Sequence, residues 1–199
     1  MKNHLIISLL ILSVGFSQQE YNINDLIEMD NGLWSVKFRD EPITGKVYGG
    51  FGKDGEELTK VYIGKLINGE KDGKWTFWFH NTGTKQYEEN WKDGKLDGLS
   101  TNWYKNGQKE VEGTYKDGKE DGLFTGWYEN GQKEFEGTWK DGESFFSNSW
   151  DTNGKVMVKD GNGLHTSWYE NGQKEFEGTY KDGELISSKI WNEDGSVRE

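Results

Sequence analysis

One seventeen-residue stretch occurs twice in this chain with a single difference. Residues 127–143 read WYENGQKEFEGTWKDGE, and residues 168–184 read WYENGQKEFEGTYKDGE. A third, looser copy, WYKNGQKEVEGTYKDGK, occupies residues 103–119. Repetition at a period of about 20 to 50 residues is typical of proteins built from stacked units that bury their apolar surface against one another. The repeat therefore constrains the fold more than any other feature.

Each unit has the pattern of a β-hairpin. Short runs rich in aromatic residues and threonine alternate with Asn-Gly and Asp-Gly pairs, which favour tight turns between strands. In one unit we predict strands at residues 99–104 and 108–116, joined by a three-residue turn at 105–107. Glycine tolerates a positive φ, so the predicted turn residues are Gly107, Gly131 and Gly172.

The turn length predicts which side chains share a face. A three-residue turn pairs Trp103 with Lys109 and, with strict alternation, groups Trp103 with Val111, Gly113 and Tyr115. The sequence thus predicts one apolar face with a recurring structural core, consisting of Trp78, Trp103, Trp127, Trp168, Tyr115, Trp139 and Tyr180. The in-strand glycines at 113, 137 and 178 are predicted to leave room for a neighbouring indole ring.

These units predict an all-β fold, an elongated single-layer twisted antiparallel meander of tandem β-hairpin repeats. Because isolated hairpins are unstable and stacked ones bury each other's rims, we expect about 12 to 14 strands in one sheet. Residues 22–29 are expected to hold one short helical turn. Residues 33–38 and 42–51 are expected to form an opening hairpin that caps the sheet.

The sequence predicts four segments along the chain. Residues 1–17 carry a basic residue, an apolar run and small residues before position 18, which is typical of a secretory signal peptide. Residues 18–32 are predicted as a linker, residues 33–73 as the capping hairpin with a degenerate first repeat, and residues 74–199 as tandem repeats with a terminal half-repeat. We therefore expect export to the periplasm or the extracellular space.

Composition excludes several classes of function. The chain has no cysteine, which rules out disulfides, thiolate chemistry and zinc–thiolate sites. Its net charge of −11 disfavours nucleic acid and favours cationic partners. We expect no membrane insertion of the mature chain. Although the mean hydropathy is −0.96, the 10 Trp, 9 Tyr and 10 Phe supply enough apolar area for a folded protein.

Residues 111–131, VEGTYKDGKEDGLFTGWYENG, resemble the MORN repeat. They are most similar to the bacterial MORN variant found in proteins described as YwqK-type antitoxin components. Residues 41–50, EPITGKVYGG, resemble the first segment of those proteins. The resemblance implies a hairpin-repeat scaffold with an interaction surface, and it brings no catalytic residues.

The sequence holds no arrangement typical of an enzyme. His80 and His165 occupy unrelated repeat positions without a nucleophile motif, so both are interpreted as structural or exposed. The Asp-Gly turns lack the ligand order of calcium loops and are interpreted as turn formers, with weak calcium binding as the alternative. The repeated Glu pairs are interpreted as a solvated ladder. We predict no catalytic residues, no metal and no cofactor.

Repeated tyrosines are the predicted binding residues. Tyr104, Tyr128 and Tyr169 are placed on the polar face, where they could stack on a sugar or on a partner's side chain; cross-strand packing is the alternative. The leading hypothesis is a non-enzymatic exported scaffold that binds an unidentified protein, with an antitoxin-like role as a narrower version. The alternative is a glycan or cell-wall binding module that uses repeated exposed aromatics.

Overall fold

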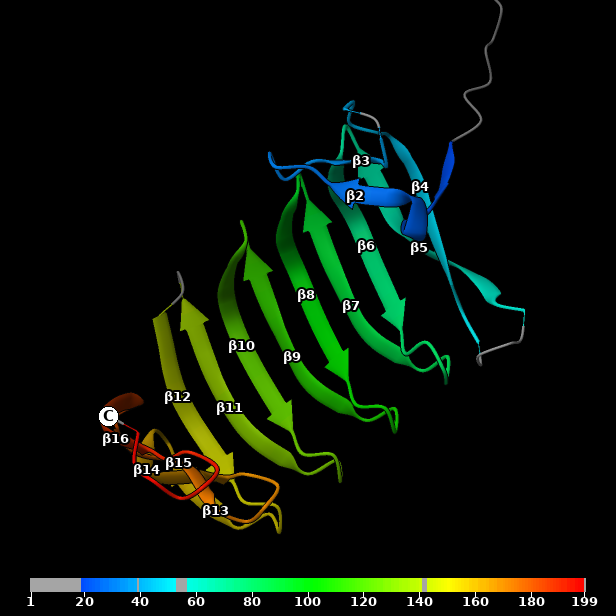
Figure 1. The fold of residues 1–199 in the computed structure, drawn as a ribbon. Coiled ribbons are helices and arrows are strands. Elements are labelled where there is room, and N and C mark those ends of the chain that lie inside the picture. The colour runs from blue at the N-terminus through cyan, green and yellow to red at the C-terminus, as the bar shows by residue number, and fades with distance from the viewer. Residues whose placement is uncertain (1–18, 39, 53–56, 141–142, 199) are drawn as a thin grey trace, which may run out of the picture.

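The structure, a computed structural model, describes residues 19–38, 40–52, 57–140 and 143–198. The predicted signal peptide at residues 1–17 lies outside these ranges. Fourteen strands form one sheet in which every strand except the first pairs in chain order with the next, and the sheet does not close on itself. Figure 1 shows these strands side by side along an elongated molecule. The predicted single-layer antiparallel meander is confirmed.

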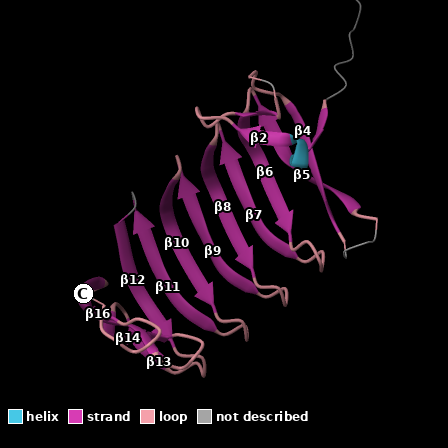
Figure 2. Ribbon diagram, in the orientation of Figure 1, coloured by secondary structure: helices cyan, strands magenta, loops and turns pink. Residues whose placement is uncertain are grey.

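The strand bounds follow the repeat. The elements are β1 Glu20–Asn22, η1 Ile23–Asp25, β2 Leu26–Glu28, β3 Trp34–Val36, β4 Gly45–Phe51, β5 Thr59–Ile67, β6 Glu70–Trp78, β7 Lys85–Lys92, β8 Lys95–Trp103, β9 Lys109–Lys116, β10 Lys119–Trp127, β11 Lys133–Lys140, β12 Glu143–Trp150, β13 Val156–Lys159, β14 Asn162–Trp168, β15 Lys174–Lys181 and β16 Glu184–Ile190. Within the described residues the one helical element is the 3-10 turn η1, as the sequence predicts, and Figure 2 shows it beside the strands. No helix in the described ranges has the length and hydropathy to cross a membrane.

The two sides of the sheet along which the strands end and turn carry different kinds of turn. At one edge, two-residue Asp-Gly turns place both residues in the left-handed region, as at Asp117 (φ 50°) and Gly118 (φ 83°). At the other edge, Tyr104 donates its N–H to the Gln108 carbonyl at 2.9 Å, which encloses the three-residue turn 105–107. Gly107, Gly131 and Gly172 have φ of 86°, 83° and 81° in these turns.

A bulge after each Asn-Gly turn sets which side chains share a face. Trp103 pairs with Lys109 as predicted, but Asn102 pairs with Val111, so Glu110 is an extra residue in β9. An extra residue reverses the face to which the rest of the strand points. The predicted grouping of Trp103 with Val111, Gly113 and Tyr115 is therefore wrong, and these residues lie on opposite faces of the sheet.

The sheet consequently has two distinct faces. The aromatic face carries rings on β6, β7, β9 to β12 and β15, namely Trp75, Phe77, Tyr87, Trp91, Tyr115, Phe124, Phe135, Trp139, Phe146, Phe176 and Tyr180. The ion-pair face carries threonine, glutamate and lysine in the middle of each hairpin and tryptophan at the turn, as at Thr101, Glu112, Lys109 and Trp103. The predicted core residues are thus divided between both faces.

The N-terminal segment covers one end of the aromatic face. Residues 18–32 were expected to be a linker, but their described part contributes β1, which pairs in parallel with β4, and β2, which contains the buried Leu26. The predicted opening hairpin is wrong, since β3 pairs with β2 in a separate two-stranded sheet and β4 joins the main sheet.

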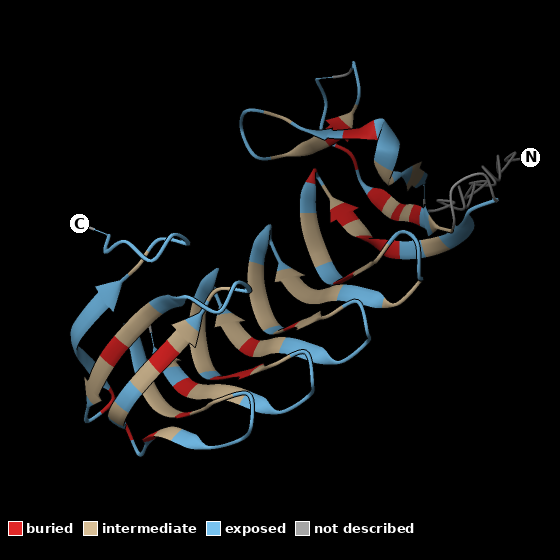
Figure 3. Ribbon diagram, turned by 60° about the horizontal axis from the view of Figure 1, so that its bottom comes forward, coloured by how far each residue is buried: buried red, intermediate tan, exposed pale blue. Residues whose placement is uncertain are grey.

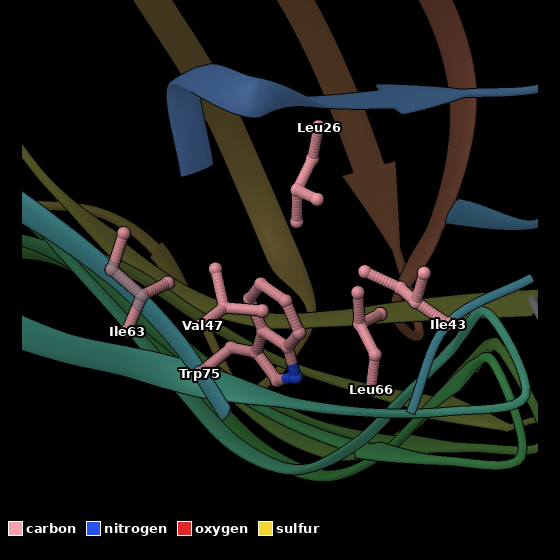
Figure 4. Close-up of a cluster of buried hydrophobic side chains, with 6 residues drawn as sticks. All are labelled: Leu26, Ile43, Val47, Ile63, Leu66 and Trp75. Atoms are coloured by element: carbon pink, nitrogen blue, oxygen red, sulfur yellow. The ribbon is translucent and has the colours of Figure 1, made fainter. Parts of the chain in front are cut away.

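A small hydrophobic core lies beneath this cover. Leu26 from β2 packs above Val47, Ile63, Leu66 and Trp75 of the main sheet, as Figure 4 shows. Trp75 and Leu66 are fully buried. Figure 3 shows buried segments at this end and further buried segments along the remaining strands, which are otherwise of intermediate or full exposure. The chain therefore has a conventional core under β2 and β3, and a second, smaller buried region at the C-terminal end, where Phe146 of β12 stacks on Tyr180 of β15 and Val158 is fully buried.

Candidate binding site

Rings from neighbouring strands touch one another along the aromatic face. Tyr115 on β9 meets Phe124 on β10 edge to face with centroids 5.5 Å apart, and Phe124 lies 4.8 Å from the ring of Trp139 on β11. The phenyl ring lies against Gly113, where an added Cβ would be 2.1 Å from it. The predicted space beside this in-strand glycine is confirmed, although a phenyl ring and not an indole fills it.

Two adjoining hollows lie along this face. One has a volume of about 250 Å³ and is lined by Ser100, Asn102, Val111, Gly113, Tyr115, Glu120, Phe124, Phe135 and Trp139. The other has about 430 Å³ and is lined by Phe79, Gln86, Tyr87, Asn102, Trp103, Tyr104, Lys105, Glu110 and Glu129. Because Asn102 lines both, we treat them as one feature, the aromatic groove.

The opposite face is occupied by ion pairs. Glu112 accepts hydrogen bonds from the Thr101 hydroxyl at 3.1 Å and from Lys109 Nζ at 2.5 Å. The same lysine–glutamate pair recurs at Lys133–Glu136 and Lys174–Glu177. Thr101 is 5% exposed, so the pairs form over a nearly buried hydroxyl row. This face has its charges matched within the chain.

Lysines also cover the tryptophan rings of the ion-pair face. Lys109 Nζ lies 5.4 Å from the ring centroid of Trp127, and Lys85 Nζ lies 5.2 Å from that of Trp103. An ammonium group over an indole face is a cation–π contact. Trp103 and Trp127 are half-buried, whereas Trp168 is 49% exposed. These indoles therefore join neighbouring repeats and do not form a closed core.

The predicted binding tyrosines connect one repeat to the next. Tyr104, Tyr128 and Tyr169 donate their hydroxyls to the backbone carbonyls of Trp127, Trp150 and Trp191, each at 2.8 Å. The asparagine of each turn makes a parallel link, as where Asn106 Nδ2 donates to the Glu129 carbonyl at 2.7 Å. This geometry agrees with the structural alternative for the tyrosines, and binding by them stays a prediction.

Three segments of the sequence match the model of a known repeat family. Residues 96–117, 120–141 and 161–182 each match the family model described as "MORN repeat variant". Over these three segments the chain is similar to MORN-variant repeats. A search of the curated proteins found no match.

The three matched MORN-variant units coincide with the hairpins β8–β9, β10–β11 and β14–β15. The aromatic groove lies on the first two of them, with contributions from β7 and the turn before it. The resemblance inferred from the sequence is confirmed for the repeat, and the likeness to YwqK-type proteins stays a prediction.

The sequence-based analysis missed the groove residues of the MORN-variant units. Asn102, Glu120 and Phe135 were not considered as binding residues. Glu120 occupies the same relative position as Leu96 in the preceding unit, so the change from leucine to glutamate at a repeated site was the available signal. The bulge hid this signal because it changed the face of every residue in β9 and β11.

Burial and carboxylates together shape the electrostatics of the groove. Burial raises the pKa of Tyr115, and the nearby Glu120 raises it further. Burial also raises the pKa of Tyr128 to about 12, with Glu134 adding to the effect. Glu134 itself has a pKa raised by burial and then by Glu110 and Glu175. The aromatic face therefore carries negative charge close to its rings.

The histidines have separate surroundings. His165 lies edge to face with Phe146 at 5.6 Å and shares a 3.1 Å hydrogen bond with Ser149 Oγ, and burial lowers its pKa. His80 is exposed. Among the described residues, no three His, Asp or Glu side chains are grouped to hold a metal ion. Neither histidine lines the aromatic groove.

Proposed function

We propose that this protein is a non-enzymatic scaffold that binds a partner protein through the aromatic groove of its MORN-variant sheet. The repeats supply a long, continuous surface, and the groove supplies rings and a few polar groups. Aromatic side chains flanked by polar residues are enriched where proteins bind one another.

One observation carries this proposal. At the N-terminal end the aromatic face is covered by β2 and β3, which place Leu26 over Trp75. Over β8 to β11 the same face bears Tyr115, Phe124 and Trp139, and a hollow remains there. The aromatic face therefore forms a hydrophobic core where β2 and β3 cover it. Where it is uncovered, the same kind of residues can form an interface with a partner.

The surroundings of the aromatic rings favour a protein partner over a glycan. Sugar binding by stacking needs a free ring face, whereas lysines cover the indoles of Trp103 and Trp127. The hydroxyls of Tyr104 and Tyr128 are already donated to backbone carbonyls. We place the activity outside the cytoplasm because of the predicted signal peptide, with antitoxin-like neutralisation of a partner as its narrower form.

The test uses a photoreactive amino acid at two positions of one strand. Asn102 lies in the groove, and Leu99 is 45% exposed on the opposite face of the same strand, β8. In the producing cells, we expect Asn102 to form a covalent adduct with a discrete polypeptide, and Leu99 to form none. Circular dichroism of each variant checks that the sheet is retained.

Three results would contradict the proposal. One is an adduct from Leu99 alone, and another is the absence of any polypeptide adduct from the folded Asn102 variant. The third is saturable binding of the mature protein to purified cell-wall polysaccharide that is lost in Tyr104→Ala with the fold intact. The last result would establish the glycan alternative.

A further inference from the structure

The sheet contains the same aromatic arrangement twice, once covered and once open. In the covered copy the ring of Trp75 lies against Gly64, where an added Cβ would be 2.4 Å from it. In the open copy the ring of Phe124 lies against Gly113 in the same way. In both, the glycine belongs to the preceding strand of the sheet.

A second ring completes each copy. Trp91 pairs with Gly73 two residues before Trp75, and Trp139 pairs with Gly122 two residues before Phe124. The position four residues before each first ring is also equivalent, since it is the second residue after the glycine of a two-residue turn. That position is Lys71 in the covered copy and Glu120 in the open copy.

In the covered copy the aromatic pair holds an ammonium group. Lys71 Nζ lies 4.2 Å from the ring centroid of Trp91 and 5.1 Å from that of Trp75. Burial lowers the pKa of Lys71, while Glu89 and Glu28 act in the opposite direction. The chain thus shows that this arrangement of rings accommodates a partly buried cation.

In the open copy the charge is reversed. Glu120 pairs with Tyr115 across the strands and lines the 250 Å³ hollow with Phe124 and Trp139. Within the described part of the chain, no ion pair or hydrogen bond is formed by the Glu120 carboxylate. The part-exposed rings of Tyr115 and Trp139, the 5% exposed ring of Phe124 and one unpaired carboxylate therefore line this hollow.

We propose that this hollow binds a lysine or arginine side chain presented by the partner protein, an inference that rests on the proposed function. The cation would lie over Phe124 and Trp139, as Lys71 does over its own ring pair, and would form an ion pair with Glu120. Cation–π contact and a charge-assisted hydrogen bond both favour such a group over a neutral one.

The wider charge distribution agrees with a basic partner segment. The linings of the two hollows contain Glu110, Glu120 and Glu129 against a single basic residue, Lys105. Lysines of the neighbouring strands are instead paired on the opposite face, as at Lys109 and Lys133. With a net charge of −11 for the chain, long-range attraction would also speed the approach of a basic segment.

The test is an NMR titration of the mature protein with a short blocked peptide in which lysine alternates with glycine. The matched peptide has norleucine, which keeps the hydrocarbon chain and lacks the charge. We expect the lysine peptide to shift the backbone amide signals of Gly113 and Gly122, and the norleucine peptide to leave them in place. Stronger shifts by spermidine than by the peptide would overturn the assignment to a protein side chain.

Three variants sharpen the test. We expect Glu120→Gln to weaken binding about tenfold and Glu120→Lys to abolish it, because the new ammonium group would fill the hollow as Lys71 does. Glu112→Gln is the matched control on the opposite face, and it should bind as the wild type does. Thermal unfolding of Glu120→Lys is expected to match or exceed that of the wild type, which excludes misfolding as the cause.

The outcomes separate the two proposals. If Glu120→Lys still binds the lysine peptide or the partner crosslinked at Asn102, the cation site is wrong and the groove function stands. If Glu112→Gln and Glu120→Gln weaken binding equally, the effect is one of net charge and the site is also wrong. If Asn102 crosslinks to no polypeptide, the groove function itself fails.

Discussion

The covered N-terminal end and the open middle of the aromatic face share one backbone arrangement, but their rings and their surroundings differ. Under β2 and β3, Trp75 is fully buried, and Lys71 of the same chain lies over its ring. In the groove, Trp139 is half-buried and Glu120 replaces the lysine. The comparison teaches that β2 and β3 enclose Trp75 by adding a second layer at the N-terminal end, and that β2 and β3 leave the groove over β8 to β11 open.

The covered end should lose the most stability when its ring is removed. Trp75→Ala is expected to lower the free energy of unfolding by about 3–5 kcal/mol, because it leaves a large cavity beneath β2. Trp139→Ala should cost less than half as much, since its ring is partly exposed. Urea unfolding followed by circular dichroism measures both. Equal losses would mean that the two ends are packed alike.

Trp75→Phe refines this comparison, because phenylalanine is the residue at the equivalent position, Phe124. The indole Nε1 of Trp75 is buried with no hydrogen-bond partner among the described residues. Its loss therefore removes an unsatisfied donor, and we expect Trp75→Phe to retain most of the stability lost in Trp75→Ala. A loss of stability as large as that of the alanine variant would show that stability depends on the size of the indole ring, and not simply on the burial of an aromatic ring.

Alanine substitutions of the glycines beneath the rings should lower the stability in the same order. A Cβ at Gly64 would be 2.4 Å from the Trp75 ring, which the N-terminal cover prevents from moving. We expect Gly64→Ala to cost about 1–3 kcal/mol. Gly113→Ala should cost less, because Phe124, although 5% exposed, is held only by the rings of its own sheet and has no second layer over it. The difference between their thermal midpoints checks this, and a larger loss in Gly113→Ala would contradict it.

The stability of the open part of the sheet should depend more on the hydrogen bonds that link one repeat to the next. Tyr128→Phe removes a half-buried hydroxyl that donates to the Trp150 carbonyl at 2.8 Å. The expected loss is about 1 kcal/mol, measured by urea unfolding. Glu129→Gln in the same turn is the control. No loss in Tyr128→Phe would show that the tyrosine row does not hold the repeats together.

The smallest expected effect is a pH dependence at His165. Burial lowers its pKa in the folded state from the ordinary 6.5, so the unfolded chain binds the proton more readily. The stability that the neutral imidazole provides is therefore present above about pH 6.5 and is lost as the pH falls through the lower folded value. Thermal midpoints at pH 7.5 and 5.5 should differ less in His165→Gln than in the wild type. An unchanged difference would contradict this assignment.

The repeated turns made the architecture predictable. Asn-Gly and Asp-Gly pairs specify hairpins locally, so Gly107 and its counterparts could be placed in the turns and the meander followed from their spacing. The faces could not be predicted by the same reasoning. Whether Glu110 enters the ladder or bulges out depends on contacts across strands, such as Lys109 with Glu112 and Phe124 over Gly113.

The candidate site was hidden for a related reason. The extra residue in β9 moves Val111, Gly113 and Tyr115 to the face opposite Trp103, which is the face of Phe124, so the aromatic groove cannot be recognised while the register is wrong. The covering of the aromatic face by β2 could not be predicted from local sequence pattern either, because Leu26 lies in a short, mostly polar segment. Only the three-dimensional structure shows which rings it buries.

Fluorine NMR of the protein labelled with 5-fluorotryptophan tests the central claim most directly. In the free protein, a soluble gadolinium chelate should broaden the Trp139 signal and leave the Trp75 signal sharp. Addition of the lysine peptide should protect Trp139 while Trp127, on the other face, keeps its response. A Trp139 signal already shielded in the free protein, or protection of Trp127 in place of Trp139, would contradict the account.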